Sequence, residues 1–257
     1  MTILNAKKDT VRQNAYKDLL HYARLVKGYA ETARDELISY EGNALTDTFR
    51  AHELARRLER ALGILGKVID QTDSRVFKNE KVPAAEKIVS FFEDHTDIIV
   101  KGKRDTEYGH KVFLAGGSST MILGCLIVPG NPADTDQYQS LLEQHKEWYG
   151  RMPRQVSADG GFASKENLAY AKENHIKDAV FAKKRGLSVL EMAKSNWVYK
   201  KLRNFRAGIE AGISTLKRAF GLNRATWTGW DGFARYVLSS IVSYNLLVIA
   251  RARLASA

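Results

Sequence analysis

The chain is poor in the residues that build disulfide frameworks and zinc sites. Its 257 residues include a single cysteine, and its six histidines are scattered, with none paired at ligand spacing. One cysteine excludes an internal disulfide, and together with unpaired histidines it excludes a zinc site of the usual composition. Because Cys125 lies inside an apolar run, we expect a buried thiol rather than a nucleophile or a metal ligand.

Long uncharged apolar runs are also scarce. The stretch Tyr236–Ala250 carries no charge but has only 15 residues, fewer than the roughly 20 that a membrane-spanning helix needs. The sequence has no recognisable signal peptide. We therefore expect a cytoplasmic protein in a reducing compartment, without a membrane partner.

Positive charge, by contrast, is present in excess and is concentrated in one stretch. The formal net charge is +11, and residues 183–224 hold eleven Lys or Arg against two acids, a net of +9. Apolar residues make up 44% of the chain, enough for a sizeable core. Charge that is clustered in this way favours a polyanionic partner, and nucleic acid rather than a membrane surface.

The basic stretch Trp197–Phe220 has the period of one long amphipathic helix. Apolar positions 205, 209, 213 and 216 form a stripe, and Glu210 falls beside it among basic residues. A single Glu on such a helix is most often a solvated or ion-paired side chain. The alternative is a carboxylate held in place for chemistry, and the spacing Arg206–x3–Glu210–x6–Lys217 favours it.

Hydrophobic periodicity divides the chain into two parts. Residues 10–69 predict two antiparallel helices, which form either a packing or dimerisation element or a DNA-binding one. Residues 71–104 predict a connector with a short element near 88–92. From Tyr108 the patterns predict strand, strand, helix, strand, helix, strand and then long helices. We therefore predict a helical hairpin over residues 1–75 and an α/β domain over residues 76–257.

Asp159 stands at the end of a short predicted strand, in the sequence QVSADGGFAS. Sheets of α/β proteins place their ligands at the carboxyl ends of strands, and the two glycines that follow allow a sharp turn there. The alternative is an ordinary Asp-Gly turn. Asp159 is thus a candidate ligand-binding acid, 51 residues before Glu210.

These motifs resemble those of bacterial insertion-sequence transposases of the ISNCY type, which have an RNase H-like DDE domain. The resemblance is carried by ADGGFAS, by RAGIEAGISTLKRAFG and by KGKRDTEYGHKV followed by GNPAD, and it extends over essentially the whole chain. The family pattern has a Tyr three residues before Arg206, where this chain has Arg203. The role of that Tyr is then unfilled or passes to a neighbour such as Tyr199.

The resemblance implies an RNase H-like mixed sheet flanked by helices, with three carboxylates that hold two Mg²⁺ or Mn²⁺ ions roughly 3.5–4 Å apart. Hard oxygen ligands suit these ions. Asp159 and Glu210 would be the second and third catalytic and metal-binding acids. Basic residues would contact DNA phosphates or orient Glu210. The basic residues in question are Arg203, Arg206, Lys217 and Arg218.

The first acid of the family pattern belongs to a central strand ahead of the helical hairpin. Residues 1–8 are too few and too polar to form it, so we expect an N-terminally shortened transposase, which also lacks the small helical DNA-reading domain. Asp97, before an apolar Ile-Ile-Val, is the best local substitute. Without the central strand, the strand at 156–159 either closes against the hairpin that follows Tyr108 or leaves a gap.

Two functions from different classes stay open. One is an enzyme, a metal-dependent transposase for DNA cleavage and strand transfer, inactive or partial here because two carboxylates hold a second metal poorly. The other is a DNA-binding transposase remnant or regulator without catalysis. Either would act on transposon ends and target DNA at the nucleoid, as a homodimer or larger assembly. A weaker third candidate is a helical adaptor that dimerises through residues 16–69.

Overall fold

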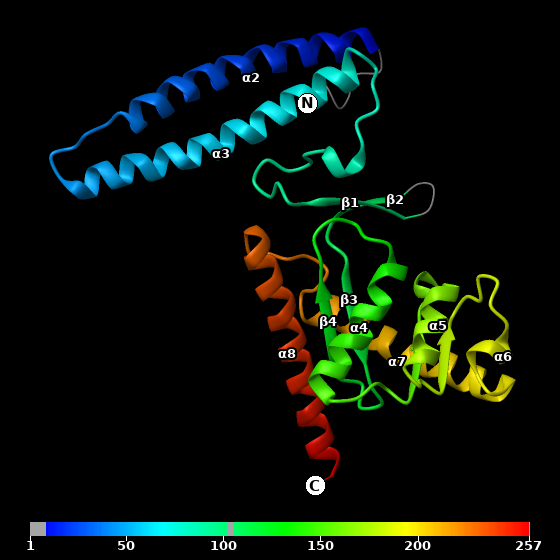
Figure 1. Cartoon of the computed structure of the whole chain (residues 1–257). Coiled ribbons are helices and arrows are strands. Elements are labelled where there is room, and N and C mark those ends of the chain that lie inside the picture. Colours follow the sequence, from blue (N-terminus) through cyan, green and yellow to red (C-terminus); the bar gives the residue numbers. More distant parts are fainter. Residues whose placement is uncertain (1–8, 102–104, 257) are drawn as a thin grey trace. The chain divides into compact units, whose positions relative to one another are not determined.

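The structure is a computed structural model that describes residues 9–101 and 105–256. The chain forms two compact units, Met1–Gly109 and His110–Ala257. The first unit is dominated by two long helices, and the second is a mixed unit of helices and strands (Figure 1).

The first unit begins with the predicted helical hairpin, α2 (Asp9–Ile38) and α3 (Leu45–Val76). The two helices lie side by side (Figure 1), and their seam buries Leu20 of α2 together with Ala51, Ala55, Leu62 and Ile69 of α3. Small alanines in this seam let the two backbones approach closely. The N-cap of α3 is Ala44, which makes no side-chain hydrogen bond.

The rest of the first unit holds a hairpin that the sequence did not predict. After a 3₁₀ turn η1 (Ala84–Glu86), strand β1 (Asp97–Lys101) pairs antiparallel with β2 (Asp105–Gly109). The expected element at residues 88–92 is absent from this described segment. Instead, the Gln71 side chain accepts from Ile88 N (2.9 Å) and donates to Ile88 O (2.8 Å), so a side chain of α3 satisfies backbone groups that a strand would have paired.

The second unit contains the two strand pairs on which the candidate site depends. The predicted hairpin is confirmed as β3 (Val112–Gly116) antiparallel to β4 (Ile122–Ile127). The second pair, β5 (Gln155–Ala158) and β6 (Asp178–Phe181), is parallel, with Val156 opposite Ala179. The helices are α4 (Asp134–Tyr149), α5 (Lys165–Glu173), α6 (Val189–Met192), α7 (Asn196–Ala219) and α8 (Gly229–Ala255).

Strand β6 is buried along its whole length, as a parallel strand covered on both faces should be. Phe181 is fully buried and contacts Tyr138 of α4, with ring centroids 5.3 Å apart. The first residue of β6, Asp178, is 1% exposed. Its carboxylate accepts hydrogen bonds from Gln155 Nε2 (2.6 Å) and Lys194 N (2.8 Å). These bonds tie β5 to β6 and fix the chain that leads into α7.

A second core lies between the β3–β4 hairpin and the two long helices α7 and α8. It contains Ile122, Leu216, Val237, Ile241 and Tyr244. The helices approach closely because α7 has a glycine there: a Cβ on Gly212 would lie 2.9 Å from the Tyr244 hydroxyl. Ser188 and Glu191 form a capping box that fixes the start of α6, and the Ser164 side chain caps the start of α5.

The outer edge of β4 is closed by side chains instead of by a strand. Asn245 of α8 accepts from Ile122 N (2.9 Å) and donates to Ile122 O (2.8 Å). Gln144 of α4 makes the same pair of bonds with Cys125 N and O, each 3.0 Å long. Within the described residues, β3 pairs only with β4 and β5 pairs only with β6, so of the two alternatives the strand at 156–159 does not pair with the β3–β4 hairpin.

Replacing Asn245 by Ala should destabilise the second unit by about 1–3 kcal/mol, because the buried N–H and C=O of Ile122 lose their hydrogen bonds to this side chain. Urea unfolding followed by tryptophan fluorescence measures this unit selectively, since all four tryptophans lie in it. The exposed Asn204 on α7 provides a matched control, and Asn204→Ala should change the unfolding free energy by less than about 0.5 kcal/mol. Equal effects of both substitutions would show that the edge bonds contribute nothing.

Helix α8 is longer than its uncharged segment predicted. Its 27 residues include an 18-residue window of mean hydropathy 1.5, so by length and composition it could cross a membrane. Only 22% of that window is buried within the structure. The buried face of α8 includes Val237, Ile241 and Tyr244, which belong to the core shared with α7 and the β3–β4 hairpin.

The Cys125 thiol is the one group of the hairpin whose titration is strongly shifted. Burial raises its pKa from 9.0 to about 12, so the thiol stays protonated at neutral pH. We expect thiol-specific labelling at pH 8 to be roughly a hundredfold or more slower in the native chain than in urea. Because the folded pKa is the higher one, the stability this group contributes is present below about pH 9 and is lost as the pH rises toward 12. Equal labelling rates with and without urea would contradict the burial.

Candidate metal and nucleic-acid site

Two features of helix α7 fix the position of Glu210: a capped N-terminus and a buried face. The Ser195 side chain accepts from Val198 N (3.2 Å), which satisfies a free N–H of the first turn. Val198, Tyr199 and Leu216 are buried and fix the rotation of the helix. The opposite face, with its basic residues and Glu210, is thereby left to solvent.

Asp159 lies directly after β5, as predicted, and caps the 3₁₀ turn η2 (Gly160–Phe162). Its Oδ1 accepts from Gly160 N at 2.6 Å, which orients the carboxylate. Gly160 is needed at this point, because a Cβ there would lie 2.6 Å from Cβ and Cγ of Lys183. The glycine therefore lets the chain after β6 pack against the turn that presents Asp159.

Arg206 brings the two acids together. Its Nη1 donates to Glu210 Oε1 at 2.6 Å and lies 3.7 Å from Asp159 Oδ1. The two carboxylate oxygens are therefore no more than about 6.3 Å apart, the sum of these distances. Asp159 and Glu210, here called the acidic pair, have side chains that are 64% and 55% exposed, whereas Arg206 is only 20% exposed.

The acidic pair offers the carboxylate oxygens that a divalent cation prefers as ligands. Two ions 3.5–4 Å apart, each about 2.0–2.1 Å from oxygen, can be shared by carboxylates at this spacing. The side chains are exposed enough for an ion to enter. Across residues 9–101 and 105–256, however, no group of three or more His, Cys, Asp or Glu is placed to hold a metal. Asp97, the candidate first acid, begins β1 in the first unit and stays a prediction.

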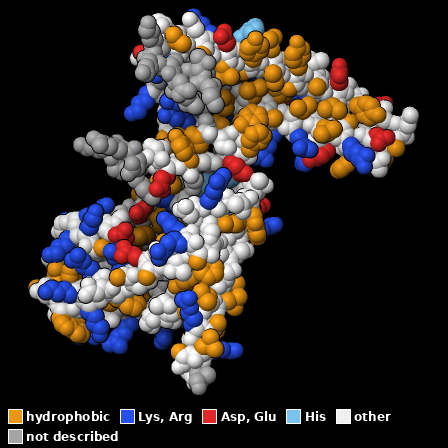
Figure 2. All heavy atoms as spheres, turned by 180° about the vertical axis from the view of Figure 1, so that it is seen from behind, with side chains coloured by type: hydrophobic (Ala, Val, Ile, Leu, Met, Phe, Trp, Pro, Cys, Tyr) orange, Lys and Arg blue, Asp and Glu red, His pale blue; other side chains and the backbone are white. Residues whose placement is uncertain are grey.

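The other predicted DNA-binding residues differ from Arg206 in exposure. Arg203, Lys217 and Arg218 are all exposed on α7. Figure 2 shows many Lys and Arg side chains over the part of the second unit where α5, α6 and α7 lie. Lys201 also lies over the exposed Trp197 ring, 5.0 Å from its centroid. The helix thus presents a cationic face beside the acidic pair.

Several residues near the pair have roles that sequence reasoning missed or misplaced. Tyr199 does not reach the acids: it is buried, and its hydroxyl donates to Phe181 O (3.3 Å). Lys111 donates to Asp134 Oδ1 (3.0 Å) and to Pro132 O (2.8 Å), and the Asp134 carboxylate abuts Gly161. This ion pair joins β3 to the turn after Asp159, and its two members lie within the motifs GHKV and GNPAD.

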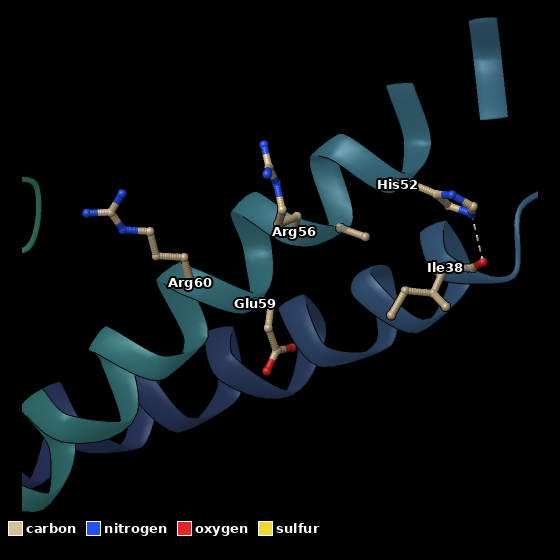
Figure 3. Close-up of a pocket in the computed structure, with 6 residues that line it drawn as sticks. Ile38, His52, Arg56, Glu59 and Arg60 are labelled. Carbon is tan, nitrogen blue, oxygen red and sulfur yellow. Dashed lines mark hydrogen bonds between the residues drawn. The ribbon is translucent and has the colours of Figure 1, made fainter. Parts of the chain in front are cut away.

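A shallow groove of about 680 Å³ in the first unit is a weaker candidate. Figure 3 shows Arg56 and Arg60 directed away from α2 while Glu59 is directed toward it. Charged groups that line the groove already have partners: Arg60 pairs with Asp94 (2.9 Å), and Glu59 pairs with Arg34 (2.7 Å). The groove is lined by Ile38, His52, Ala55, Arg56, Glu59 and Arg60. No set of unpaired polar groups converges in this groove among the residues drawn.

The cationic face of α7 indicates a polyanionic partner such as nucleic acid. Comparison with known families agrees: residues 62–246 match the family described as transposase DDE domain. The match covers well over half of the chain, which therefore belongs to this transposase family, and DNA is the partner that the family implies. No curated protein and no solved structure matches the chain significantly.

Proposed function

We propose that this chain is a transposase of an ISNCY-type insertion sequence, with an RNase H-like DDE domain over residues 76–257 and a helical hairpin over residues 1–75. Asp159 and Glu210 serve as its second and third acids. The observation that carries the proposal is their convergence on Arg206 Nη1 from elements 51 residues apart.

The arrangement of strands supports an RNase H-like sheet that lacks one strand among the described residues. The edge of β4 is closed by Gln144 and Asn245, whereas β3 and β5 have no second strand neighbour in the described part of the chain. Exposed strand edges are avoided in finished sheets. A strand between β3 and β5 would pair both edges and would enter the sheet next to Asp159.

In the proposed site Asp159 and Glu210 would hold Mg²⁺ or Mn²⁺. Such ions, when bound, activate a water or a DNA 3′-hydroxyl and stabilise the leaving oxygen of a phosphodiester. The chain's own contribution is positional. Gly160 N orients the Asp159 carboxylate, and the buried face of α7 fixes Glu210 opposite it.

The exposed cations of α7 would bind the DNA backbone beside the acids. Lys and Arg contacts to phosphates supply most sequence-independent affinity and make it fall with added salt. Arg203, Lys217 and Arg218 lie on the solvent side of the helix and serve this purpose. The protein would work on transposon ends and target DNA in the cytoplasm, at the nucleoid, without a membrane partner.

With two described acids, we expect the chain to bind DNA well and to hold a second metal ion poorly, so that cleavage is weak or absent. A divalent-ion-dependent nicking assay on DNA that contains the element's ends tests the enzyme, with Asp159→Ala as the control. Nicking that needs Mg²⁺ and is lost in Asp159→Ala supports a transposase with catalysis. Salt-dependent DNA binding without nicking supports the alternative, a transposase remnant or regulator. Nicking that survives Asp159→Ala contradicts the assigned site.

The helical hairpin favours self-association as the second activity. Four residues on α2 recur at heptad spacing and remain 51–74% exposed: Leu19, Tyr22, Val26 and Tyr29. Figure 2 shows hydrophobic side chains gathered over the hairpin. Exposed apolar stripes of this kind mark protein interfaces. Sedimentation should show a dimer that Tyr22→Glu with Val26→Glu converts to a monomer, and a monomeric parent chain would exclude this assembly.

A further inference from the structure

Arg206 takes a different position from the other cations of α7. Arg203, Lys217 and Arg218 are exposed, but only 20% of the Arg206 side chain is accessible to solvent. Its Nη1 lies between two carboxylates that are themselves more than half exposed. The guanidinium therefore lies beneath the acidic pair rather than on the surface that phosphates would reach.

We propose that Arg206 is the resident counter-ion of the acidic pair, which holds Asp159 and Glu210 together until a divalent ion displaces it. This inference rests on the proposed function of the pair as a metal site. It makes Arg206 a positioning residue for the metal-free state and removes it from the set of DNA ligands.

Helix geometry alone does not account for the contacts of Arg206 with the two carboxylates. An Arg four residues before a Glu is the less favourable order for a pair on one helix, so the Arg206–Glu210 contact gains little from helix geometry. The second carboxylate, Asp159, comes from the end of β5 and adds the contact across the pocket. One Nη1 atom thus serves acids from two separate elements.

The hydrogen bonding of the Arg206 guanidinium is also incomplete, so a metal ion can displace this side chain from the acidic pair. Arg206 Nε is buried and has no hydrogen-bond partner among the described residues, although a guanidinium offers five N–H donors. An unsatisfied buried donor weakens the arrangement that contains it. The guanidinium can therefore leave Asp159 without breaking a full network of bonds.

A divalent ion shared by the pair would compete with Arg206 for the same oxygens. Two cations within a few ångströms repel each other strongly where solvent is partly excluded. Removing the guanidinium while keeping both acids should consequently tighten ion binding. Coupling between two interacting binding events typically changes affinity by about 5- to 150-fold.

The test is a Mn²⁺ titration of the full chain, with free Mn²⁺ followed by electron paramagnetic resonance. Arg206→Gln should bind Mn²⁺ about 5- to 150-fold more tightly than the parent chain. Arg206→Lys, which keeps the charge, should stay within about threefold of the parent. Arg235→Gln, at an exposed position on α8, serves as the matched control and should leave Mn²⁺ affinity unchanged. Unchanged or weaker binding by Arg206→Gln overturns the proposal.

A second measurement on the unaltered chain covers the case in which Arg206→Gln fails to fold. Added Mg²⁺ should shift the NMR signal of the Arg206 guanidinium and leave that of Arg203 in place, and an unmoved Arg206 signal at saturating Mg²⁺ overturns the proposal. Failure of the metal site itself gives a different result, because Asp159→Asn would then bind Mn²⁺ as well as the parent chain does.

Discussion

Replacing Arg203, Lys217 and Arg218 together by Gln should lower DNA affinity on the order of 100-fold at 50 mM salt. The three side chains are exposed on one arc of α7, where each can neutralise a phosphate and release its counter-ion. Each lost contact should reduce the slope of log affinity against log salt by about 0.9, so the triple variant should lose about 3 in slope. Fluorescence anisotropy with a labelled duplex, measured from 50 to 200 mM salt, provides both quantities.

The control for this variant removes the same charge from a different helix. Arg235, Arg251 and Arg253 are exposed on α8, and their replacement by Gln lowers the net charge equally. If the effect depends on where the cations lie, the α8 variant should keep DNA affinity within about threefold of the parent. Equal losses in the two variants would mean that DNA affinity depends only on the overall net charge of +11 and that α7 is not the binding face.

Phe181→Ala should destabilise the second unit by about 3–5 kcal/mol, a large part of the 5–15 kcal/mol that a domain has. Phe181 is fully buried in β6, contacts Tyr138, and accepts the Tyr199 hydroxyl at its carbonyl. Its truncation would open a cavity beside the Tyr138 ring of α4. Urea unfolding followed by tryptophan fluorescence measures the loss.

The exposed Phe205 on α7 gives the matched control for that substitution. Its side chain is 49% exposed, so Phe205→Ala should cost less than about 1 kcal/mol. If Phe181→Ala cost no more than Phe205→Ala, the core described around β6 would not be the one that stabilises the unit.

Most elements of the second unit could be predicted because their patterns are local. The strand pattern that begins at Tyr108 predicted the β3–β4 hairpin, which the structure confirms. The missed β1–β2 hairpin has a different cause. Its strands carry charges at Asp97, Lys101, Asp105 and Glu107, which mask the period of two that a half-buried strand shows.

The sequence was sufficient to select the two candidate acids, but not to predict the side-chain contacts around them. Spacing and motif resemblance selected Asp159 and Glu210, and the structure brings them to one cation. The same spacing grouped Arg206 with the exposed cations of α7, because helical position cannot tell a side chain that turns inward from one that turns out. The contacts of Lys111 with Asp134 and of Tyr199 with Phe181 depend on tertiary packing, which a local pattern does not encode.

Iron-directed cleavage of the chain tests the central claim most directly. With added hydrogen peroxide and ascorbate, Fe²⁺ bound at a Mg²⁺ site reduces the peroxide to hydroxyl radicals, which cut the nearest backbone. We expect cuts near Asp159 and near Glu210, suppressed by excess Mg²⁺ and absent from Asp159→Asn. Cuts confined to other parts of the chain, or a pattern that Asp159→Asn leaves unchanged, would contradict a metal site shared by these two acids.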